Sequence, residues 1–298
     1  MNLYNSFYKN YLKTPNKFFL QLGKKKYSYK KIKDTVDKLQ SLTKSSKYLT
    51  LICENSILHI ALYLLASKEK KIFVPLDNNL EFETLLKQIK KFKLDNIFCD
   101  KLLFEKLRKK NLKIFNINEL NIKSYKNFSN QNKIKHQNNF LLSFTSGSTS
   151  DPKPIVFSEK TKILRAKSSI DLYSLKKNDT IIISTPLHHT LAIRLMTMAI
   201  VIQSKIIVIE NYNFEKFIKS INKNKVKFTF FISNQISEIL ANLKYLKYLK
   251  SLRSIVSSSS TLPSHLKEKL IKAYNGKVFE IYGLSEASIV SNLNIKKD

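Results

Sequence analysis

The sequence predicts an α/β protein with two lobes, each built around a parallel sheet. Short apolar runs alternate along the chain with longer segments whose apolar residues recur at intervals of three and four. This alternation is typical of strands that are connected by helices and covered by them on both faces. A polar stretch at 121–139 divides two such series. We therefore expect one lobe at about 1–135 and a second at about 136–298.

The first series begins with "FFLQLGKKKYSY" (18–29), which predicts a small hairpin around Gly23. Apolar runs then predict strands at 48–54, 71–76 and 95–100, and periodic segments predict helices at 55–68 and 80–92. The second series predicts a helix at 159–174 and strands at 140–145, 179–185, 204–210, 227–233 and 251–258. Ligands of open α/β folds bind at the carboxyl ends of the strands, so motifs at those ends are candidates for function.

Composition excludes several classes of protein. Two cysteines without a nearby cysteine or histidine cluster indicate neither a disulfide framework nor a zinc module, and they fit a reducing cytoplasm. The N-terminus lacks the apolar core of a signal peptide, and no apolar stretch is long enough to span a bilayer. The net charge is +31, but only four of the 53 basic residues are arginines. Scattered lysines are typical of a solvated surface, so we expect no specific nucleic-acid partner.

"FTSGSTSDPKP" (144–154) follows a predicted strand and contains one of the four glycines of the chain, Gly147. Glycine adopts positive φ easily, and hydroxyls with free backbone N–H groups around a tight turn can hold an anion. Lys153 adds a positive charge. The segment lacks the second glycine and the Lys-Ser/Thr pair of a Walker loop. Its composition alone is also typical of an ordinary loop.

Three further segments follow predicted strands. "VFEIYGLSEAS" (278–288) places a glycine and an acidic residue at a strand end, although such a pattern also occurs in plain surface turns. "SSSSTLPSHLKEKL" (257–270) combines four serines with Pro263 and an amphipathic helix. "TPLHHTLAIRL" (185–195) contains two adjacent histidines, and a histidine in an apolar stretch is more often a packed residue than a catalyst.

In their order along the chain, these segments resemble motifs of the adenylate-forming superfamily, which includes acyl- and aryl-CoA synthetases, luciferases and the adenylation domains of peptide synthetases. The phosphate-loop signature of that family is matched from Thr145 to Thr149 and at Lys153, but Ser150 and Pro154 replace its later glycines. The N-terminal half fits as well, in "YSYKKIKDTVDKLQSL" and in "ENSILHIALYLLASKEKKIFVPLD". The resemblance implies the N-terminal domain of an acyl-adenylate synthetase over 1–298.

The resemblance also implies a role for each motif residue. Tyr282 would stack on adenine, Gly283 would allow the sharp turn, Ser285 would face the α-phosphate, and Glu286 would hold Mg²⁺. His189 and Lys153 are the candidate catalytic residues, with pocket-lining as the alternative role for His189. The residues implied to bind the nucleotide are Thr145, Ser146, Gly147, Ser148, Thr149, Ser258, Ser259, Tyr282, Gly283 and Ser285.

The implied reaction is the ATP-dependent activation of a carboxylic acid as acyl-AMP, with coenzyme A or a carrier-protein thiol as acceptor. No Asp occurs at 185–195, where amino-acid-activating domains place one, so a fatty or aryl acid is favoured. The chain contains no Thr-Gly-Asp, and we expect it to lack the β-barrel lobe and the C-terminal lid domain of the family. We therefore expect a truncated form, or half of a split enzyme completed in trans by a C-terminal polypeptide. The alternatives are a non-catalytic ATP- or acyl-binding remnant and a lysine-rich nucleic-acid-associated protein.

Overall fold

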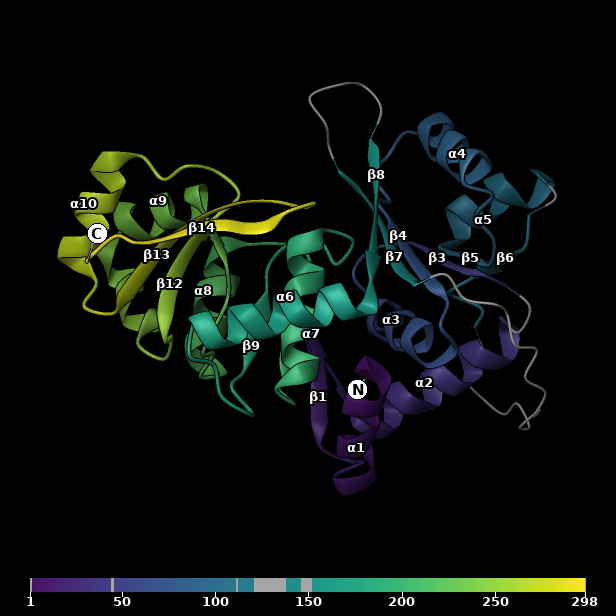
Figure 1. Cartoon of the computed structure of the whole chain (residues 1–298), viewed down its shortest axis with the longest axis horizontal. Coiled ribbons are helices and arrows are strands. Elements are labelled where there is room, and N and C mark those ends of the chain that lie inside the picture. Colours follow the sequence, from purple (N-terminus) through teal and green to yellow (C-terminus); the bar gives the residue numbers. More distant parts are fainter. Residues whose placement is uncertain (1, 44–45, 111, 121–137, 146–151, 298) are drawn as a thin grey trace. The chain divides into compact units, whose positions relative to one another are not determined.

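A computed structural model describes residues 2–43, 46–110, 112–120, 138–145 and 152–297. It confirms the α/β class and divides the chain into two compact units (Figure 1). Unit 1 comprises 1–18, 27–162 and 186–189, and unit 2 comprises 19–26, 163–185 and 190–298. The boundary at 135/136 that we expected from the sequence differs from this division. The reason is that the strands after the polar stretch pair with the sheet of unit 1.

Unit 1 contains a six-stranded sheet. Its strands lie in the order β6 (Ile114–Asn116), β5 (Ile97–Cys99), β3 (Tyr48–Ile52), β4 (Ile72–Leu76), β7 (Asn139–Thr145) and β8 (Lys153–Ser158). All neighbours pair parallel except β7 and β8, which form an antiparallel pair at the edge. The predicted strands at 48–54, 71–76, 95–100 and 140–145 are thus confirmed.

Helices cover both faces of this sheet (Figure 1). They are α1 (Leu3–Lys13), α2 (Tyr29–Leu42), α3 (Ile57–Glu69), α4 (Phe82–Lys91), α5 (Lys101–Leu107) and the 3₁₀ turn η1 (Arg108–Lys110). Leu85, Leu86 and Ile89 of α4 pack on β3, β4 and β5 in one core cluster. Buried α3 lies against the other face, beneath α1 and α2. Cover on both faces explains why the central strands β3, β4 and β5 are almost entirely buried.

Unit 2 contains two four-stranded sheets among the described residues. The first has the order β2 (Lys25–Ser28), β1 (Phe18–Leu22), β10 (Ile206–Val208) and β9 (Ile181–Ile183). The second has the order β11 (Phe231–Ile232), β12 (Ser254–Ser258), β13 (Lys277–Leu284) and β14 (Ser288–Asn294). The predicted hairpin at 18–29 forms β1 and β2, and β1 pairs parallel with β10. The strand predicted at 227–233 is reduced to Phe231–Ile232, preceded by one isolated bridge between Ile181 and Phe228.

The core of unit 2 lies between its sheets and helices. The helices are α6 (Glu159–Leu172), whose first turn belongs to unit 1, α7 (Thr190–Val201), α8 (Phe214–Lys223), α9 (Ser233–Ala241), the 3₁₀ segment η2 (Leu243–Leu249) and α10 (Ser264–Ala273). One buried cluster joins Ile182 and Ile207 of the first sheet to Ile255 and Val278 of the second. This packing fixes the carboxyl ends of β12 and β13, where two of the sequence motifs lie.

Candidate active site

The β7–β8 hairpin of unit 1 carries the first motif. Thr145 ends β7, Lys153 begins β8, and the two residues are paired in antiparallel register. Lys153 is exposed. Ser146, Gly147, Ser148 and Thr149 lie outside the described residues. The hairpin therefore places a solvent-accessible lysine directly opposite the last residue of β7.

The histidine motif forms a short loop, 186–189, that belongs to unit 1 although its neighbours in sequence belong to unit 2. The backbone N–H of Leu187 donates to Oδ1 of Asn55 at 2.7 Å, just before α3. The N–H of His189 donates to the carbonyl of Pro186 at 3.1 Å, which closes the turn. The rings of His188 and His189 lie 4.3 Å apart, with His189 on the solvent side. The imidazole ring of His189, the candidate catalytic histidine, is therefore accessible to solvent.

Burial keeps the histidines of this loop neutral at pH 7. It lowers the pKa of His188 to about 4, and the neighbouring His189 acts in the same direction. Asp77 opposes the effect from 3.8 Å, the distance between its Oδ2 and Nε2 of His188. Burial also lowers the pKa of His59, to about 3, with a further contribution from His188. His189, whose pKa is lowered by partial desolvation, can therefore act as a neutral hydrogen-bonding group.

The serine-rich motif of unit 2 lies at the carboxyl end of β12. Ser258 is buried at the last position of the strand, and Ser259 is exposed with a left-handed φ of +79°. Glu280 of β13 accepts a hydrogen bond from the N–H of Leu262 at 2.7 Å and forms an ion pair with Lys267 at 2.6 Å. The segment after β12 is therefore tied to the neighbouring strand. Sequence reasoning did not single out Glu280.

The Tyr-Gly motif lies at the carboxyl end of β13, where the strand turns into β14. Tyr282 is 61% exposed. The pairing register with β14 shifts between Tyr282 and Gly283. A Cβ atom at Gly283 would lie 2.2 Å from the carbonyl oxygen of Ser288, so the close approach of the two strands requires glycine. The hairpin thus offers an accessible aromatic face beside a tight backbone turn.

Two arginines fix the turn that carries Ser285 and Glu286. Arg165 of α6 donates to the carbonyl of Ser285 at 2.8 Å and to that of Glu286. Arg194 of α7 donates to Oγ of Ser288 at 2.6 Å, and Ser288 has a left-handed φ of +75°. Burial, with the charge of Arg165, lowers the pKa of Arg194 to about 10, so it remains charged at pH 7. Sequence reasoning missed both residues, although they are two of only four arginines.

The turn leaves a carboxylate and a hydroxyl for a ligand. Oγ of Ser285 lies 3.1 Å from Oγ1 of Thr190 at the start of α7, and the side chain of Glu286 is exposed. Among the described residues, no three His, Cys, Asp or Glu side chains come together as a metal cluster. Mg²⁺ is commonly held by one or two carboxylates together with substrate phosphates. A single exposed carboxylate therefore fits an ion that is bound jointly with a nucleotide.

The structure thus gathers Ser258, Ser259 and the Tyr282–Glu286 turn at the carboxyl ends of two neighbouring strands in unit 2. Lys153 and His189 belong to unit 1. A family model described as "AMP-binding enzyme" matches residues 7–298. The chain belongs to the AMP-binding enzyme family.

In that part of the chain that the structure describes, no helix has the length and apolar character needed to cross a membrane.

Curated AMP-binding relatives include two CoA ligases. An indoleacetate–CoA ligase from Aromatoleum aromaticum is 23% identical over 154 residues, which make up 50% of this chain and 30% of that ligase. A 2-succinylbenzoate–CoA ligase from Oceanobacillus iheyensis is 26% identical over 149 residues, or 50% of this chain and 31% of that protein. The matched segments span about a third of the length of these relatives.

Solved structures of AMP-binding proteins share the fold. O-succinylbenzoate coenzyme A synthetase (MenE) from Bacillus subtilis, in complex with AMP, superposes with a TM-score of 0.83 at 17% identity, over 98% of this chain and 77% of that chain. The N-terminal subdomain of NpsA from Klebsiella oxytoca has a TM-score of 0.82 at 14% identity, over 98% and 75% of the two chains. The predicted fold, the N-terminal domain of an adenylate-forming enzyme, is confirmed.

Proposed function

We propose that this chain binds ATP and activates a carboxylic acid as its acyl-adenylate, as an adenylate-forming ligase of the acyl-CoA synthetase type. The observation that supports this most strongly is the Tyr282–Ser288 turn. It combines an exposed tyrosine, a glycine at a close approach of two strands, and a hydroxyl and a carboxylate on a turn that Arg165 and Arg194 hold. The match to the AMP-binding family model over 7–298 supports the same function.

In the proposed reaction, a carboxylate oxygen forms a bond to the α-phosphorus of ATP, and the bond to the β-phosphate oxygen breaks to release pyrophosphate. Two anions must approach each other, so positioning and charge neutralisation supply most of the catalysis. Tyr282 would stack on the adenine, Ser285 would donate to the α-phosphate, and Lys153 would contact the phosphates. Glu286 would hold Mg²⁺, which supplies further positive charge to the phosphates when bound.

His189 is the candidate for contact with the acid. Its lowered pKa and its place on the solvent side of the 186–189 loop suit a neutral ring that donates to or accepts from a carboxyl group. A neutral histidine would orient the attacking carboxylate without trapping it in an ion pair. The absence of Asp from 185–195 favours a fatty or aryl acid over an α-amino acid. The CoA ligases among the relatives make coenzyme A the favoured acceptor, and a carrier-protein thiol is the alternative.

The proposed function is tested by ATP–pyrophosphate exchange over a panel of fatty and aryl acids. We expect at least one acid to stimulate exchange, either with the chain alone or after addition of a polypeptide that carries a Thr-Gly-Asp barrel and a lid. Glu286→Gln is expected to lower the stimulated rate by about 10²–10³, the usual cost of losing one group that stabilises transition-state charge.

The matched control is Glu215→Gln. Glu215 is an exposed carboxylate of α8 that pairs with Lys219 at 2.9 Å, and it lies outside the motifs. Its substitution is expected to leave the exchange rate unchanged. If no acid stimulates exchange under either condition, or if the two glutamate variants lose activity equally, the proposed function is wrong.

A further inference from the structure

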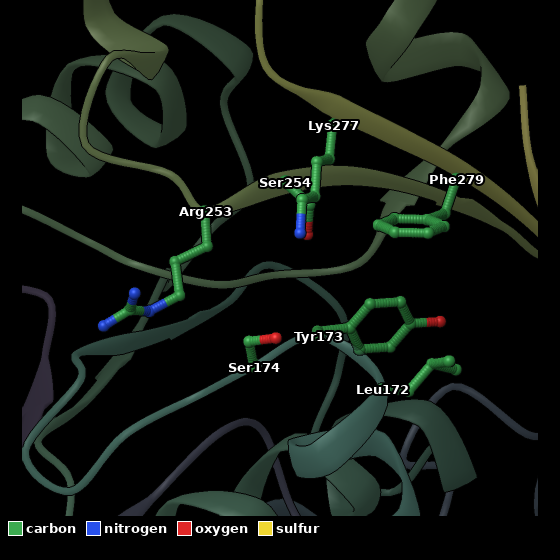
Figure 2. Close-up of a pocket in the computed structure, with 7 residues that line it drawn as sticks. All are labelled: Leu172, Tyr173, Ser174, Arg253, Ser254, Lys277 and Phe279. Carbon is green, nitrogen blue, oxygen red and sulfur yellow. The ribbon is translucent and has the colours of Figure 1, made fainter. Parts of the chain in front are cut away.

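Unit 2 contains a second candidate site at the amino ends of β12 and β13, the opposite ends of these strands from the nucleotide motifs. A pocket of about 180 Å³ lies there (Figure 2). It is lined by Leu172, Tyr173, Ser174, Arg253, Ser254, Lys277 and Phe279. None of these residues belongs to a motif that the proposed function uses. Ligand pockets commonly measure about 300–1,000 Å³, so this one has room for a fragment-sized molecule and excludes a nucleotide or a long acyl chain.

One wall of the pocket is aromatic and held in place. The ring of Tyr173 meets that of Phe279 edge to face, with 5.5 Å between the ring centres. The ring of Tyr173 also stacks on Phe228 at 4.9 Å, and its hydroxyl donates to Oδ1 of Asn292 at 3.1 Å. Tyr173 and Phe279 are both buried. A ring fixed by three such contacts can bind a flat apolar group with little loss of side-chain entropy.

The other wall is polar and carries a positive charge. Ser254 and Lys277 are register partners at the starts of β12 and β13, so their side chains lie on the same face of the sheet. Oγ of Ser254 is buried and has no hydrogen-bond partner among the described residues. Lys277 is exposed and forms no ion pair with any residue that the structure describes. A buried hydroxyl without a partner is uncommon and calls for one, such as a ligand atom or a water molecule.

Arg253 does not add to this charge. Its Nε and Nη2 atoms donate to the two carboxylate oxygens of Asp179, at 2.6 and 3.0 Å. In Figure 2 its guanidinium extends away from the other lining side chains, so its stem forms the wall. The charge of Arg253 is thus balanced by Asp179. The net charge of the pocket is therefore about +1, and it comes from Lys277.

We propose that this pocket binds a small aryl carboxylate of about the size of benzoate. Its carboxylate would accept hydrogen bonds from the ammonium of Lys277 and the hydroxyl of Ser254, and its ring would pack against Tyr173 and Phe279. The single positive charge matches a monoanion, and the aromatic wall favours a flat ring over inorganic phosphate. The proposal does not rest on the proposed function, because the two use different residues.

The test is a titration of the chain with benzoate, followed by ligand-observed NMR. We expect saturable binding that Lys277→Gln weakens about tenfold, which corresponds to about 1.4 kcal/mol. Ser254→Ala should also weaken it, while unfolding temperatures show that both variants fold. Lys269→Gln, at an exposed lysine of α10, is the matched control and should change nothing. Benzyl alcohol, which has the ring without the charge, and inorganic phosphate, which has charge without a ring, should both bind more weakly.

His189→Ala separates this pocket from the acid site of the proposed function. It should leave benzoate binding intact. The proposal is overturned if benzoate does not saturate, if Lys277→Gln and Lys269→Gln bind it equally, or if only His189→Ala weakens binding. Phosphate binding as tight as that of benzoate would also contradict it, because the aromatic wall would then contribute nothing.

Discussion

Gly283 is the residue on which the shape of the Tyr-Gly turn depends most directly. The carbonyl of Ser288 occupies the space where a Cβ would lie, and a backbone atom cannot move aside as a side chain can. We expect Gly283→Ala to lower the free energy of unfolding by about 1–3 kcal/mol, the usual cost of overpacking, and to weaken AMP binding. Urea unfolding and AMP titration measure the two effects.

Gly276→Ala is the control for this prediction. Its Cβ would meet ring atoms of Tyr274, a buried member of the core cluster, at 2.5 Å, so this variant also suffers overpacking but lies outside the nucleotide motifs. We expect a comparable loss of stability and unchanged AMP affinity. Equal loss of AMP affinity in both variants would mean that the close approach at Gly283 does not shape the site.

Arg165 and Arg194 place Ser285 and Glu286 through backbone and hydroxyl contacts rather than through contact with a ligand. We expect Arg165→Ala to weaken Mg²⁺-dependent ATP binding about tenfold, about 1.4 kcal/mol, because two carbonyls lose their donor. Arg108→Ala is the matched control, since Arg108 is exposed and pairs with Glu105 of the adjoining helix α5, outside the motifs. Calorimetric titration at fixed Mg²⁺ measures both, and equal affinities for the two variants would refute this positioning role.

At the scale of elements, periodicity located most strands and helices because a buried parallel sheet requires apolar strands and half-buried helices. It could not show which strands pair across long distances. The pairing of β1 with β10, nearly 190 residues apart, depends on packing that no local pattern records. The strand expected at 227–233 is divided, because Lys227 and Phe228 pair with the segment 180–182 of the first sheet, whereas Phe231 and Ile232 pair with β12 of the second. Likewise, the two arginines lie in helices whose local sequence carries no sign of a turn more than ninety residues away.

The first turn of α3 gives a prediction about pH. Nδ1 of His59 accepts from the N–H of Ser56 at 3.3 Å, and burial lowers the pKa of His59 to about 3. Histidines of the unfolded chain titrate near pH 6.5. Between about pH 6.5 and pH 3, His59 is therefore protonated in the unfolded chain and neutral in the folded chain. This contribution to stability is complete above about pH 6.5 and is lost as pH falls toward 3. The slope is at most about 1.4 kcal/mol per pH unit for one histidine.

His59→Asn retains an acceptor for the Ser56 N–H and removes the titrating ring. We expect its free energy of unfolding, measured in urea between pH 7 and pH 5, to change less with pH than that of the wild type. The difference between the two slopes should be at most about 1.4 kcal/mol per pH unit, which corresponds to one proton. Part of the pH dependence of stability should remain in this variant, because burial also lowers the pKa of His188, to about 4. A slope that is the same in both proteins would show that His59 is not the titrating group.

At the scale of the whole molecule, the net charge of +31 suggests a nucleic-acid partner, although its lysines are scattered along the chain. We expect DNA and RNA to bind without sequence preference and with an affinity that falls steeply with salt, because lysines act by releasing counterions. Fluorescence anisotropy with several duplexes at increasing salt tests this. A preference above about tenfold, or about 1.4 kcal/mol, that persists at physiological salt would support the nucleic-acid alternative.

The most direct test of the central claim is a calorimetric titration of the chain with AMP and with ATP at fixed Mg²⁺, in the wild type and in Tyr282→Ala. We expect saturable binding of both nucleotides. We also expect that loss of the exposed ring weakens binding of both by about 1–3 kcal/mol, the usual contribution of stacking a base on an aromatic side chain. Tyr212→Ala, at a half-exposed tyrosine outside the motifs, should bind like the wild type. Nucleotide affinity that is undetectable in the wild type, or that Tyr282→Ala leaves unchanged, would contradict the account.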